Sequence, residues 1–417
     1  MIFKKNKKCR ICGNSNLKKV ISLGNQFIQG KFKKKINKFE RKIPLNILLC
    51  HPSLRERNVC GLLQLENSVN KNILYNQYYY RSGVNLTMKR HLNLIARKAS
   101  SFFTNKCNVL DIGCNDGTLL SSYSKSYTRY GLDPSQIVLE IKKEKQLNLI
   151  NDFFPTKHLE KNFYKNYFDI ITSIAMFYDL EDPSFFVKKI KNILSNNGIW
   201  ILELSYMPEM LKLNSYDTIC HEHLEYYSLS VLQFLFKKNF MKIFKIELNK
   251  INGGSIRCFV THENNNKYDK KKNYYLIKKI VSKEKKLKLN TIIPYKNFQK
   301  KIYSNKFQLR KVLLNIKKKK KIIHIYGAST KGNTILQFCK INNKFIKYAA
   351  DRNPHKVGLK TLGSNILIID ESKSRKMKPD YYLVLPWHFQ NEFVKREREF
   401  LKNGGKFIFP LPNVRIY

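Results

Sequence analysis

The chain has 417 residues, of which 43% are hydrophobic, so it is globular and long enough for two or three domains. No run of 18 apolar residues exists to cross a membrane, and lysines follow Met1-Ile2-Phe3 where a signal peptide needs an apolar region, so we expect a cytoplasmic protein. A formal net charge of +49 ordinarily indicates nucleic acid or an anionic membrane. Because lysine is spread through every segment, as codon bias in an adenine- and thymine-rich genome produces, we expect solvated surface lysines and neither partner.

Four of the nine cysteines lie in the first sixty residues. Cys9 and Cys12 have a spacing at which two thiolates bind one tetrahedral ion, whereas Cys50 and Cys60 flank a polar stretch that predicts an expanded loop. A disulfide framework is not expected in the cytoplasm. We predict a structural zinc on these four cysteines in a small domain over residues 1–71, with His51 as a substitute for Cys50 and free buried cysteines as the alternative.

A second domain, over residues 72–266, begins with an amphipathic helix at 86–103 and an apolar strand. The strand enters a glycine turn, which we expect to lead into a helix and to bring backbone N–H groups close to a ligand. Asp133 lies 22 residues beyond Asp111, where a doubly wound fold places the carboxylate that binds ribose hydroxyls. The residues predicted to contact this nucleotide-type ligand are Asp111, Gly113, Asn115, Asp116, Gly117 and Asp133.

Strands and helices alternate through the rest of this domain, with strands at 168–173 and 199–203 and a helix at 183–194. This spacing predicts a parallel sheet covered on both faces, with Asp111, Asp133 and Glu203 gathered at the carboxyl ends of the strands. Arg257 follows the pair Gly253-Gly254 and could reach an anionic group, although a plain hairpin turn is the alternative.

The densest set of ionisable groups is His221-Glu222-His223. Its histidines are two residues apart, so they do not share a helix face as they do in a zinc peptidase. Histidine suits proton transfer near neutral pH, and a neighbouring carboxylate can fix its tautomer. From these residues alone, a catalytic loop and an exposed polar loop are equally supported.

The last third contains a lysine-rich helical connector at 267–318 and a second small α/β domain at 319–417. Here residues 322–334 repeat the pattern of strand, small-residue turn and helix. Ser329, Thr330 and the turn amides can donate to phosphate, while Lys331 adds a point charge.

In this order, the cysteine pairs, the turn at 111–117, the run at 218–223, the glycine pair with Arg257 and the segment 326–333 resemble the sugar C-methyltransferase family. The resemblance implies a structural zinc domain, a central Rossmann-like class I methyltransferase domain that binds S-adenosylmethionine, and a C-terminal Rossmann-like domain that helps bind a nucleotide-linked keto-deoxysugar. It also implies that His223 is the base that forms an enolate, with Glu222 beside it, while Tyr178 or His221 stabilises the oxyanion. We assign acceptor binding to Tyr80, Ser82, Arg257, Ser329, Thr330, Lys331 and Asn333.

Two positions depart from family members that methylate carbon 3, which carry tyrosine where this chain has Cys220 and histidine where it has Tyr178. The sugar and the methylated carbon therefore stay open. An O- or N-methyltransferase, or a basic zinc-containing nucleic-acid-binding protein, is the alternative function. We expect a monomer or a weak homo-oligomer.

Overall fold

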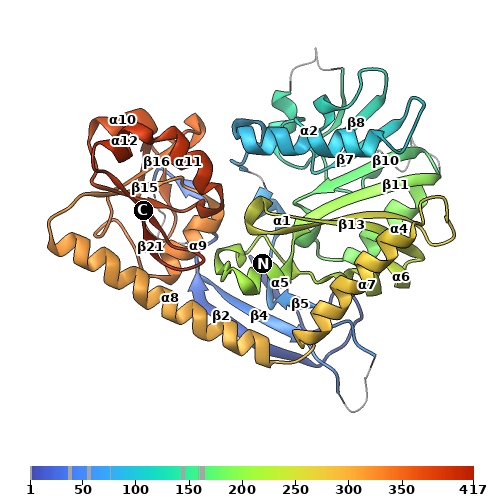
Figure 1. Cartoon of the computed structure of the whole chain (residues 1–417), viewed down its shortest axis with the longest axis horizontal. Helices are drawn as coiled ribbons and strands as arrows, with labels where there is room; N and C mark the ends of the chain where they lie inside the picture. Colours follow the sequence, from blue (N-terminus) through green and yellow to red (C-terminus); the bar gives the residue numbers. More distant parts are fainter. Residues whose placement is uncertain are drawn as a thin grey trace.

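A computed structural model describes residues 2–35, 40–53, 58–75, 77–141, 146–157, 159 and 165–417. Two lobes face each other in Figure 1, and the N-terminal strands lie at the base between them. Helix α8 (Ile293–Lys318) runs along this base from one lobe to the other. No helix among the described residues is long and apolar enough to cross a membrane.

The central lobe is built on a seven-stranded sheet in the order β13-β14-β11-β10-β7-β8-β9. Its first five strands in the chain are parallel, while β13 and β14 form an antiparallel hairpin at one edge. The strands are β7 (Asn108–Ile112), β8 (Thr128–Leu132), β9 (Asn148–Ile150), β10 (Phe168–Ile174), β11 (Leu194–Ser205), β13 (Met241–Asn249) and β14 (Ser255–His262). The chain starts in the middle at β7 and winds outward both ways, so the crevice at the carboxyl ends of β7 and β10 is the topological switch point.

Three helices of this lobe have side-chain N-caps. Asn85, Asp182 and Ser228 each accept a backbone N–H in the first turn of the helix that follows. The helices of this lobe and its connector are α1 (Lys71–Tyr75), α2 (Leu86–Ser100), α4 (Pro183–Ile193), α5 (Met207–Lys212), α6 (Leu229–Lys238) and α7 (Lys271–Lys286). Single-turn 3₁₀ helices connect them: η1 (Ser82–Val84), η2 (Leu120–Ser122), η3 (Gln136–Glu140), η5 (Phe177–Asp179), η6 (Tyr216–Thr218) and η7 (Ile251–Gly253).

The helix expected after the glycine turn is the short η2 instead. Ser121 and Ser122 donate their hydroxyls to the carbonyls of Gly117 and Thr118, at 2.8 and 3.0 Å. Short hydroxyl side chains compete in this way for the backbone groups of a helix, so serine-rich sequence here favours a single turn.

The N-terminal segment forms a four-stranded antiparallel sheet in the order β12-β5-β4-β2, and a separate pair of strands, β1 and β6. One strand of this sheet, β12, comes from the central lobe. Their bounds are β1 (Phe3–Lys5), β2 (Leu17–Gln26), β4 (Ile43–Cys50), β5 (Leu63–Leu65), β6 (Asn67–Val69) and β12 (Glu225–Tyr226).

The C-terminal lobe has an eight-stranded sheet in the order β21-β20-β19-β15-β16-β18-β17-β3, so its last strand comes from the N-terminal segment. Its strands are β3 (Phe32–Lys33), β15 (Ile323–Tyr326), β16 (Tyr348–Asp351), β17 (Lys360–Thr361), β18 (Leu367–Asp370), β19 (Tyr381–Val384), β20 (Lys406–Phe409) and β21 (Arg415–Ile416). Its helices are α9 (Thr330–Phe338), η8 (Pro354–Lys356), α10 (Glu371–Lys376), η9 (Trp387–Phe389), α11 (Gln390–Arg396) and α12 (Arg398–Lys402).

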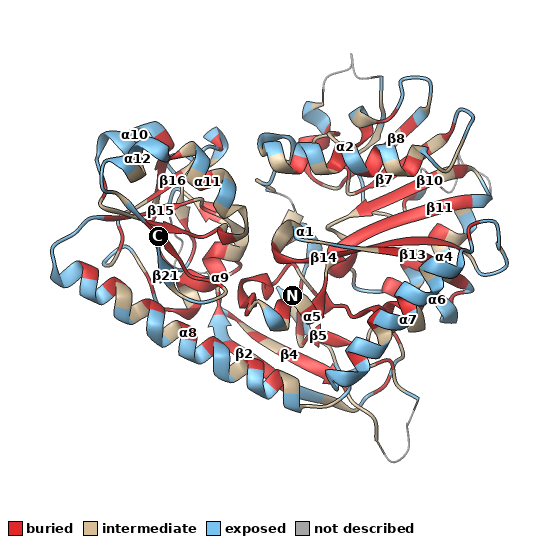
Figure 2. Ribbon diagram, viewed as in Figure 1, coloured by how far each residue is buried: buried red, intermediate tan, exposed pale blue. Residues whose placement is uncertain are grey.

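Buried residues line the strands and the inner helix faces, whereas the outer helix faces are exposed (Figure 2). The N-terminal segment belongs to both main cores. Cys9, Ile11 and Leu62 pack with the aromatic core of the central lobe, while Ile47 and Leu49 pack with the core of the C-terminal lobe. The segment therefore joins the lobes through buried apolar contacts.

Candidate active site and metal centre

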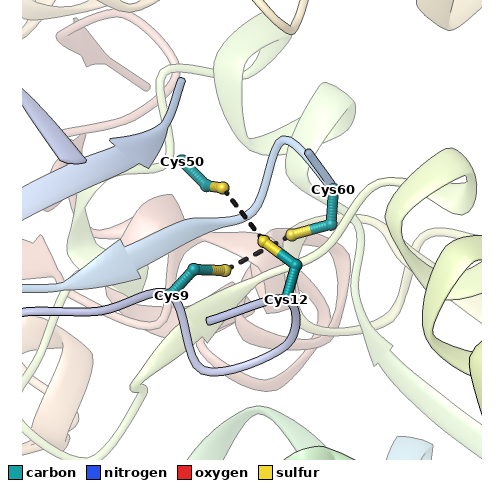
Figure 3. Close-up of side chains that lie close together, drawn as sticks. All are labelled: Cys9, Cys12, Cys50 and Cys60. Carbon is teal, nitrogen blue, oxygen red and sulfur yellow. Dashed lines mark hydrogen bonds between the residues drawn. The ribbon is translucent and has the colours of Figure 1, made fainter. Parts of the chain in front are cut away.

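The four predicted zinc ligands converge on one point (Figure 3). Their sulfur atoms all lie within 4.8 Å of one another, with Cys9 3.3 Å from Cys60 and Cys12 3.5 Å from Cys50. Gly13, at φ +80°, permits the tight turn in which its N–H donates to the Cys9 carbonyl. Sulfur atoms bound tetrahedrally about 2.3 Å from zinc lie roughly 3.8 Å apart, so these side chains fit a zinc ion.

Cys50, and not His51, belongs to the sulfur cluster. The His51 Nδ1 atom lies 2.9 Å from the carbonyl oxygen of Pro52, and Asn14 donates to the Cys50 sulfur at 3.4 Å. Hydrogen bonds among the thiols lower the pKa of Cys12, with Cys50 the first cause, and raise the pKa of Cys9 and Cys60, with Cys12 the first cause. The expanded loop expected between Cys50 and Cys60 includes residues 54–57, which lie outside the described residues.

The glycine turn follows β7 and has the backbone of a ligand-binding turn. Gly113, Asn115 and Gly117 all have positive φ, at +79°, +51° and +70°. A Cβ atom on Gly113 would lie 3.0 Å from Met176 Cγ, so glycine is needed there for close approach as well as conformation. The Asn115 N–H donates to Asp133 Oδ2 at 2.8 Å, which ties the turn to the end of β8.

Residues 80–83 lie across this turn and are held by two of its side chains. Asn115 accepts from the Ser82 N–H at 3.0 Å and donates to the Tyr80 carbonyl at 2.9 Å. Asp116 accepts from the Gly83 N–H at 2.8 Å. Tyr80 and Ser82 thus contact the turn through their backbones, and the Tyr80 residue is 48% exposed.

Two carboxyl groups, those of Asp111 and Asp133, lie at the carboxyl ends of β7 and β8, where the methyl donor is predicted to bind. Burial raises the pKa of Asp111 to about 7, although Thr172 donates to it at 2.6 Å. Asp133 accepts from the N–H and hydroxyl of Ser135, at 2.8 and 2.5 Å, as well as from Asn115. A carboxylate has about four lone-pair sites, so Asp133 retains capacity to accept from a hydroxyl-bearing ligand.

The loop at 219–224, which contains the histidine pair, is held by all three parts of the chain. From the N-terminal segment, Gln29 accepts the His221 N–H at 3.1 Å; from the central lobe, the Tyr178 carbonyl accepts the Leu224 N–H at 2.7 Å. From the C-terminal lobe, Thr334 donates to the Ile219 carbonyl at 3.1 Å. This loop therefore lies at the junction of the three parts and is not an exposed polar loop.

His223 has the tautomer of a proton acceptor. Its Nδ1 lies 2.7 Å from the Thr218 carbonyl, a partner that can only accept, so Nδ1 carries the proton and the Nε2 lone pair stays available. Its ring packs on that of Tyr178, with centroids 4.4 Å apart. Burial, followed by the charge of Lys331, lowers the pKa of His223 to about 3, so the ring is neutral at neutral pH.

Glu222 lies directly over the backbone of Gly30. A Cβ atom added to Gly30 would lie 1.9 Å from Glu222 Oε1 and 3.4 Å from the Thr330 hydroxyl. Burial raises the pKa of Glu222 to about 7, while the charge of Lys31 opposes this rise. Gly30 leaves the space in which groups from the three parts of the chain meet.

His221 occupies a different environment from His223. It is 1% exposed, and its ring nitrogens lie 2.8 Å from Gln29 Oε1 and 3.3 Å from the Ile43 carbonyl. These contacts anchor the loop to the N-terminal segment. Both nitrogens are thus engaged within the protein, and donation by His221 to a substrate oxygen stays a prediction.

The segment 176–179 connects the glycine turn with His223. Met176 packs against Gly113, and two residues later the Tyr178 ring packs against His223. Burial raises the pKa of Tyr178 well above its ordinary value, so its hydroxyl keeps its proton and can donate it in a hydrogen bond. The segment thus links the glycine turn to the His223 and Tyr178 rings.

The start of α9 faces the same loop from the C-terminal lobe. Ser329 caps this helix by accepting from the Gly332 N–H at 3.0 Å. The Lys331 ammonium donates to the Asn252 carbonyl at 3.0 Å, and its charge acts on Asp217, Cys220 and His223. Burial lowers the pKa of Lys331. Its position suits an anionic ligand group.

Two predicted acceptor ligands are engaged elsewhere. Arg257 is 2% exposed; it pairs with Glu203 at 2.8 Å and Glu247 at 2.9 Å, because β14 places it opposite Glu203 in β11. Arg257 is therefore part of a buried ion-pair network here, and its role in acceptor binding stays a prediction. Asn333 is 1% exposed and donates to the Gln29 carbonyl at 2.7 Å, so it joins α9 to the N-terminal segment.

Sequence reasoning missed several residues of this junction. The sequence gives no indication of the role of Gly30, since a single glycine in the N-terminal segment does not predict a contact with Glu222. Trp387 donates to Asp217 at 2.9 Å and packs 3.4 Å from the Cβ position of Gly253, which explains the glycine pair as a close approach. Tyr78 and Asp179 also lie here, since both act electrostatically with Glu222.

Three family models match successive segments of the chain: "Putative zinc binding domain" over residues 9–75, "Methyltransferase domain" over 76–239 and "C-methyltransferase C-terminal domain" over 250–412. The chain is 25% identical over 421 residues to C-methyltransferase NovU of Streptomyces niveus, covering 98% of this chain and 96% of that protein.

Solved structures with similarity include an S-adenosylmethionine-dependent methyltransferase from Clostridium acetobutylicum (14% identity, TM-score 0.35). The complex titled "Complex between the Haloferax volcanii Trm112 methyltransferase activator and the putative methyltransferase" has 14% identity and a TM-score of 0.36. Each match covers 42% of this chain and 91% of the other.

Proposed function

Because the chain belongs to the S-adenosylmethionine-dependent C-methyltransferases, with their zinc-binding, methyltransferase and C-terminal domains in order, we propose that it methylates a ring carbon of a nucleotide-linked keto-deoxysugar. The observation that carries this proposal is the segment 176–179, which joins the glycine turn to His223. This segment would bring the methyl donor close to the base.

The residues of the glycine turn fit the donor. Positive φ at Gly113, Asn115 and Gly117 turns the backbone at the carboxyl end of β7, and Asp133 can accept from ribose hydroxyls. When bound, S-adenosylmethionine supplies an electrophilic methyl group. The proposed cofactor ligands are Asp111, Gly113, Asn115, Asp116, Gly117 and Asp133.

A carbon beside a ketone becomes nucleophilic only when its proton is removed. The Nε2 atom of His223 would take this proton, since Nδ1 is held as the donor to Thr218. The charge that develops on the ketone oxygen needs a donor, and the protonated hydroxyl of Tyr178 beside His223 can supply it. Glu222, with its raised pKa, can carry a proton near neutral pH.

The C-terminal lobe would hold the nucleotide of the acceptor. Ser329, Thr330 and Lys331 lie at the start of α9, which contacts the loop through Thr334, and Lys331 provides a cation for phosphate. Tyr80 and Ser82 lie over the turn, where they would border the sugar. The acceptor would thus span the junction between the two lobes.

The test is a screen of nucleotide-linked ketosugars for methyl uptake, with the methylated atom identified by NMR of the product. His223→Ala should abolish methyl transfer and leave S-adenosylmethionine binding intact. Unchanged turnover would rule out His223 as the base. Methylation at oxygen or nitrogen would refute the proposed enolate chemistry.

A further inference from the structure

A buried ion pair links the turn at residues 9–12, here called the metal knuckle, to the loop that contains His223, the candidate base. Arg10 lies between the ligands Cys9 and Cys12, and its Nε is 3.4 Å from Glu225 Oε1. The two side chains are 3% and 0% exposed. Among the described residues, the charge of Arg10 and the backbone of Leu180 favour the Glu225 carboxylate, and no side chain donates a hydrogen bond to it.

The knuckle and β5 fix the position of Arg10. Its backbone N–H donates to Gln64 Oε1 at 3.0 Å, and its guanidinium donates to the Leu65 carbonyl at 3.0 Å and to the Ser68 hydroxyl at 2.8 Å. Gln64 in turn stands opposite Glu225 in the pairing of β5 with β12. A planar guanidinium with several donors can hold the strand and the carboxylate together, which an ammonium cannot.

Glu225 follows His223 by two residues and fixes how the chain leaves the loop. Between them, Leu224 donates its N–H to the Tyr178 carbonyl at 2.7 Å and accepts the Leu65 N–H at 2.8 Å. A shift of Glu225 therefore moves the one short segment that sets His223 against Tyr178.

Without Arg10, the Glu225 carboxylate would be buried close to the acidic groups of Asp179 and Glu181. Burial raises the pKa of Glu225 well above its ordinary value and the charge of Arg10 lowers it, so without Arg10 the buried acid must either take up a proton or move toward solvent. Such movement would pull β12 away from β5 and release the loop.

We propose that Arg10 is a positioning residue for His223, through which the occupied metal knuckle holds the base in register with Tyr178. This inference rests on the proposed role of His223. It gives the zinc domain a share in the reaction although no ligand of the metal touches the crevice.

The experiment is ¹⁵N-histidine NMR of the full-length, zinc-loaded chain, with the His223 signal assigned by its loss in His223→Gln. The wild-type signal should report one Nδ1–H tautomer. In Arg10→Met both tautomers should be populated, with zinc content and S-adenosylmethionine affinity within twofold of wild type. Lys8→Met, which removes an exposed cation beside the same knuckle, should leave the signal unchanged.

Adding Glu225→Gln to Arg10→Met should restore the single tautomer, because no unpaired charge remains. With a methyl acceptor in hand, kcat should fall at least tenfold in Arg10→Met and recover in the double variant. Should Arg10→Met not fold, Arg10→Lys keeps the cation and should give an intermediate tautomer ratio.

An unchanged His223 signal in zinc-loaded Arg10→Met or Arg10→Lys would overturn the proposal. Loss of zinc from either variant would also overturn it, since Arg10 would then act on the metal site alone. The tautomer is measured without a substrate, so this test can fail or succeed independently of the proposed methylation.

Discussion

Substitution of Gly30 by alanine tests the junction of the three parts most directly. Its φ lies outside the left-handed region, so alanine is compatible with the backbone, and the effect comes from the new Cβ atom. That atom would lie 1.9 Å from Glu222 Oε1, whereas real contacts of this kind essentially never fall below 3.0 Å. The carboxylate must therefore move by roughly 1 Å, a displacement that can cost about 10²-fold in rate.

We expect Gly30→Ala to lower kcat by about 10²-fold and the free energy of unfolding by about 1–3 kcal/mol, with S-adenosylmethionine binding unchanged. The assay is methyl transfer to the acceptor found in the screen, with calorimetry for the donor. Gly24→Ala is the control, because its Cβ meets nothing within 4 Å and costs only backbone strain at φ +73°. Adding Glu222→Asp shortens the acid and should restore part of the rate; wild-type turnover in Gly30→Ala would refute the reasoning.

Three further predictions concern the metal, the carboxyl group and the turn. Metal analysis should find one zinc per chain and less in Cys60→Ser, and wild-type protein without stoichiometric zinc would contradict the structural site. A Glu222 pKa of about 7 means that the folded state loses stability as pH rises from about 4.5 to 7. Glu222→Gln should therefore raise the free energy of unfolding by up to about 3 kcal/mol at pH 8, seen as a higher melting temperature, and leave it unchanged at pH 4. Equal effects at both pH values would exclude this. Asn115→Gly keeps the left-handed backbone but removes the hydrogen bonds to Tyr80 and Ser82. Calorimetry should therefore show about tenfold weaker S-adenosylmethionine binding. An unchanged Kd would show that residues 80–83, which lie across the turn, play no part in binding.

Local patterns predicted the parts of the fold whose cause is local. The alternation of apolar strands with helices indicated a covered parallel sheet, which the structure shows for β7 to β11 but not for the antiparallel β13 and β14. The spacing of Asp111 and Asp133 indicated adjacent strand ends. The prediction of a helix after Gly117 was wrong, because the hydroxyls of Ser121 and Ser122 compete for the backbone carbonyls of this segment.

The rest depends on contacts between distant segments. The sequence does not show that Arg257 and Glu203 are partners, so each was predicted to face a ligand. The register of β11 with β14 places them opposite each other, where they form an ion pair. The sequence around Gly30 and around Arg10 likewise does not predict the contacts of these residues. Their roles come from Glu222 and Glu225, which neighbour the one loop that sequence had already selected.

The pairing of β3 with β17 has a consequence for how the protein can be made. Lys33 pairs with Lys360, so the partner of this early strand leaves the ribosome only when most of the chain has been synthesised. The C-terminal sheet cannot be completed before then, and a fragment that begins after β3 would expose the unpaired edge of β17, a surface that invites aggregation. The three parts are therefore expected to be produced as one chain and to resist dissection into separately expressed pieces.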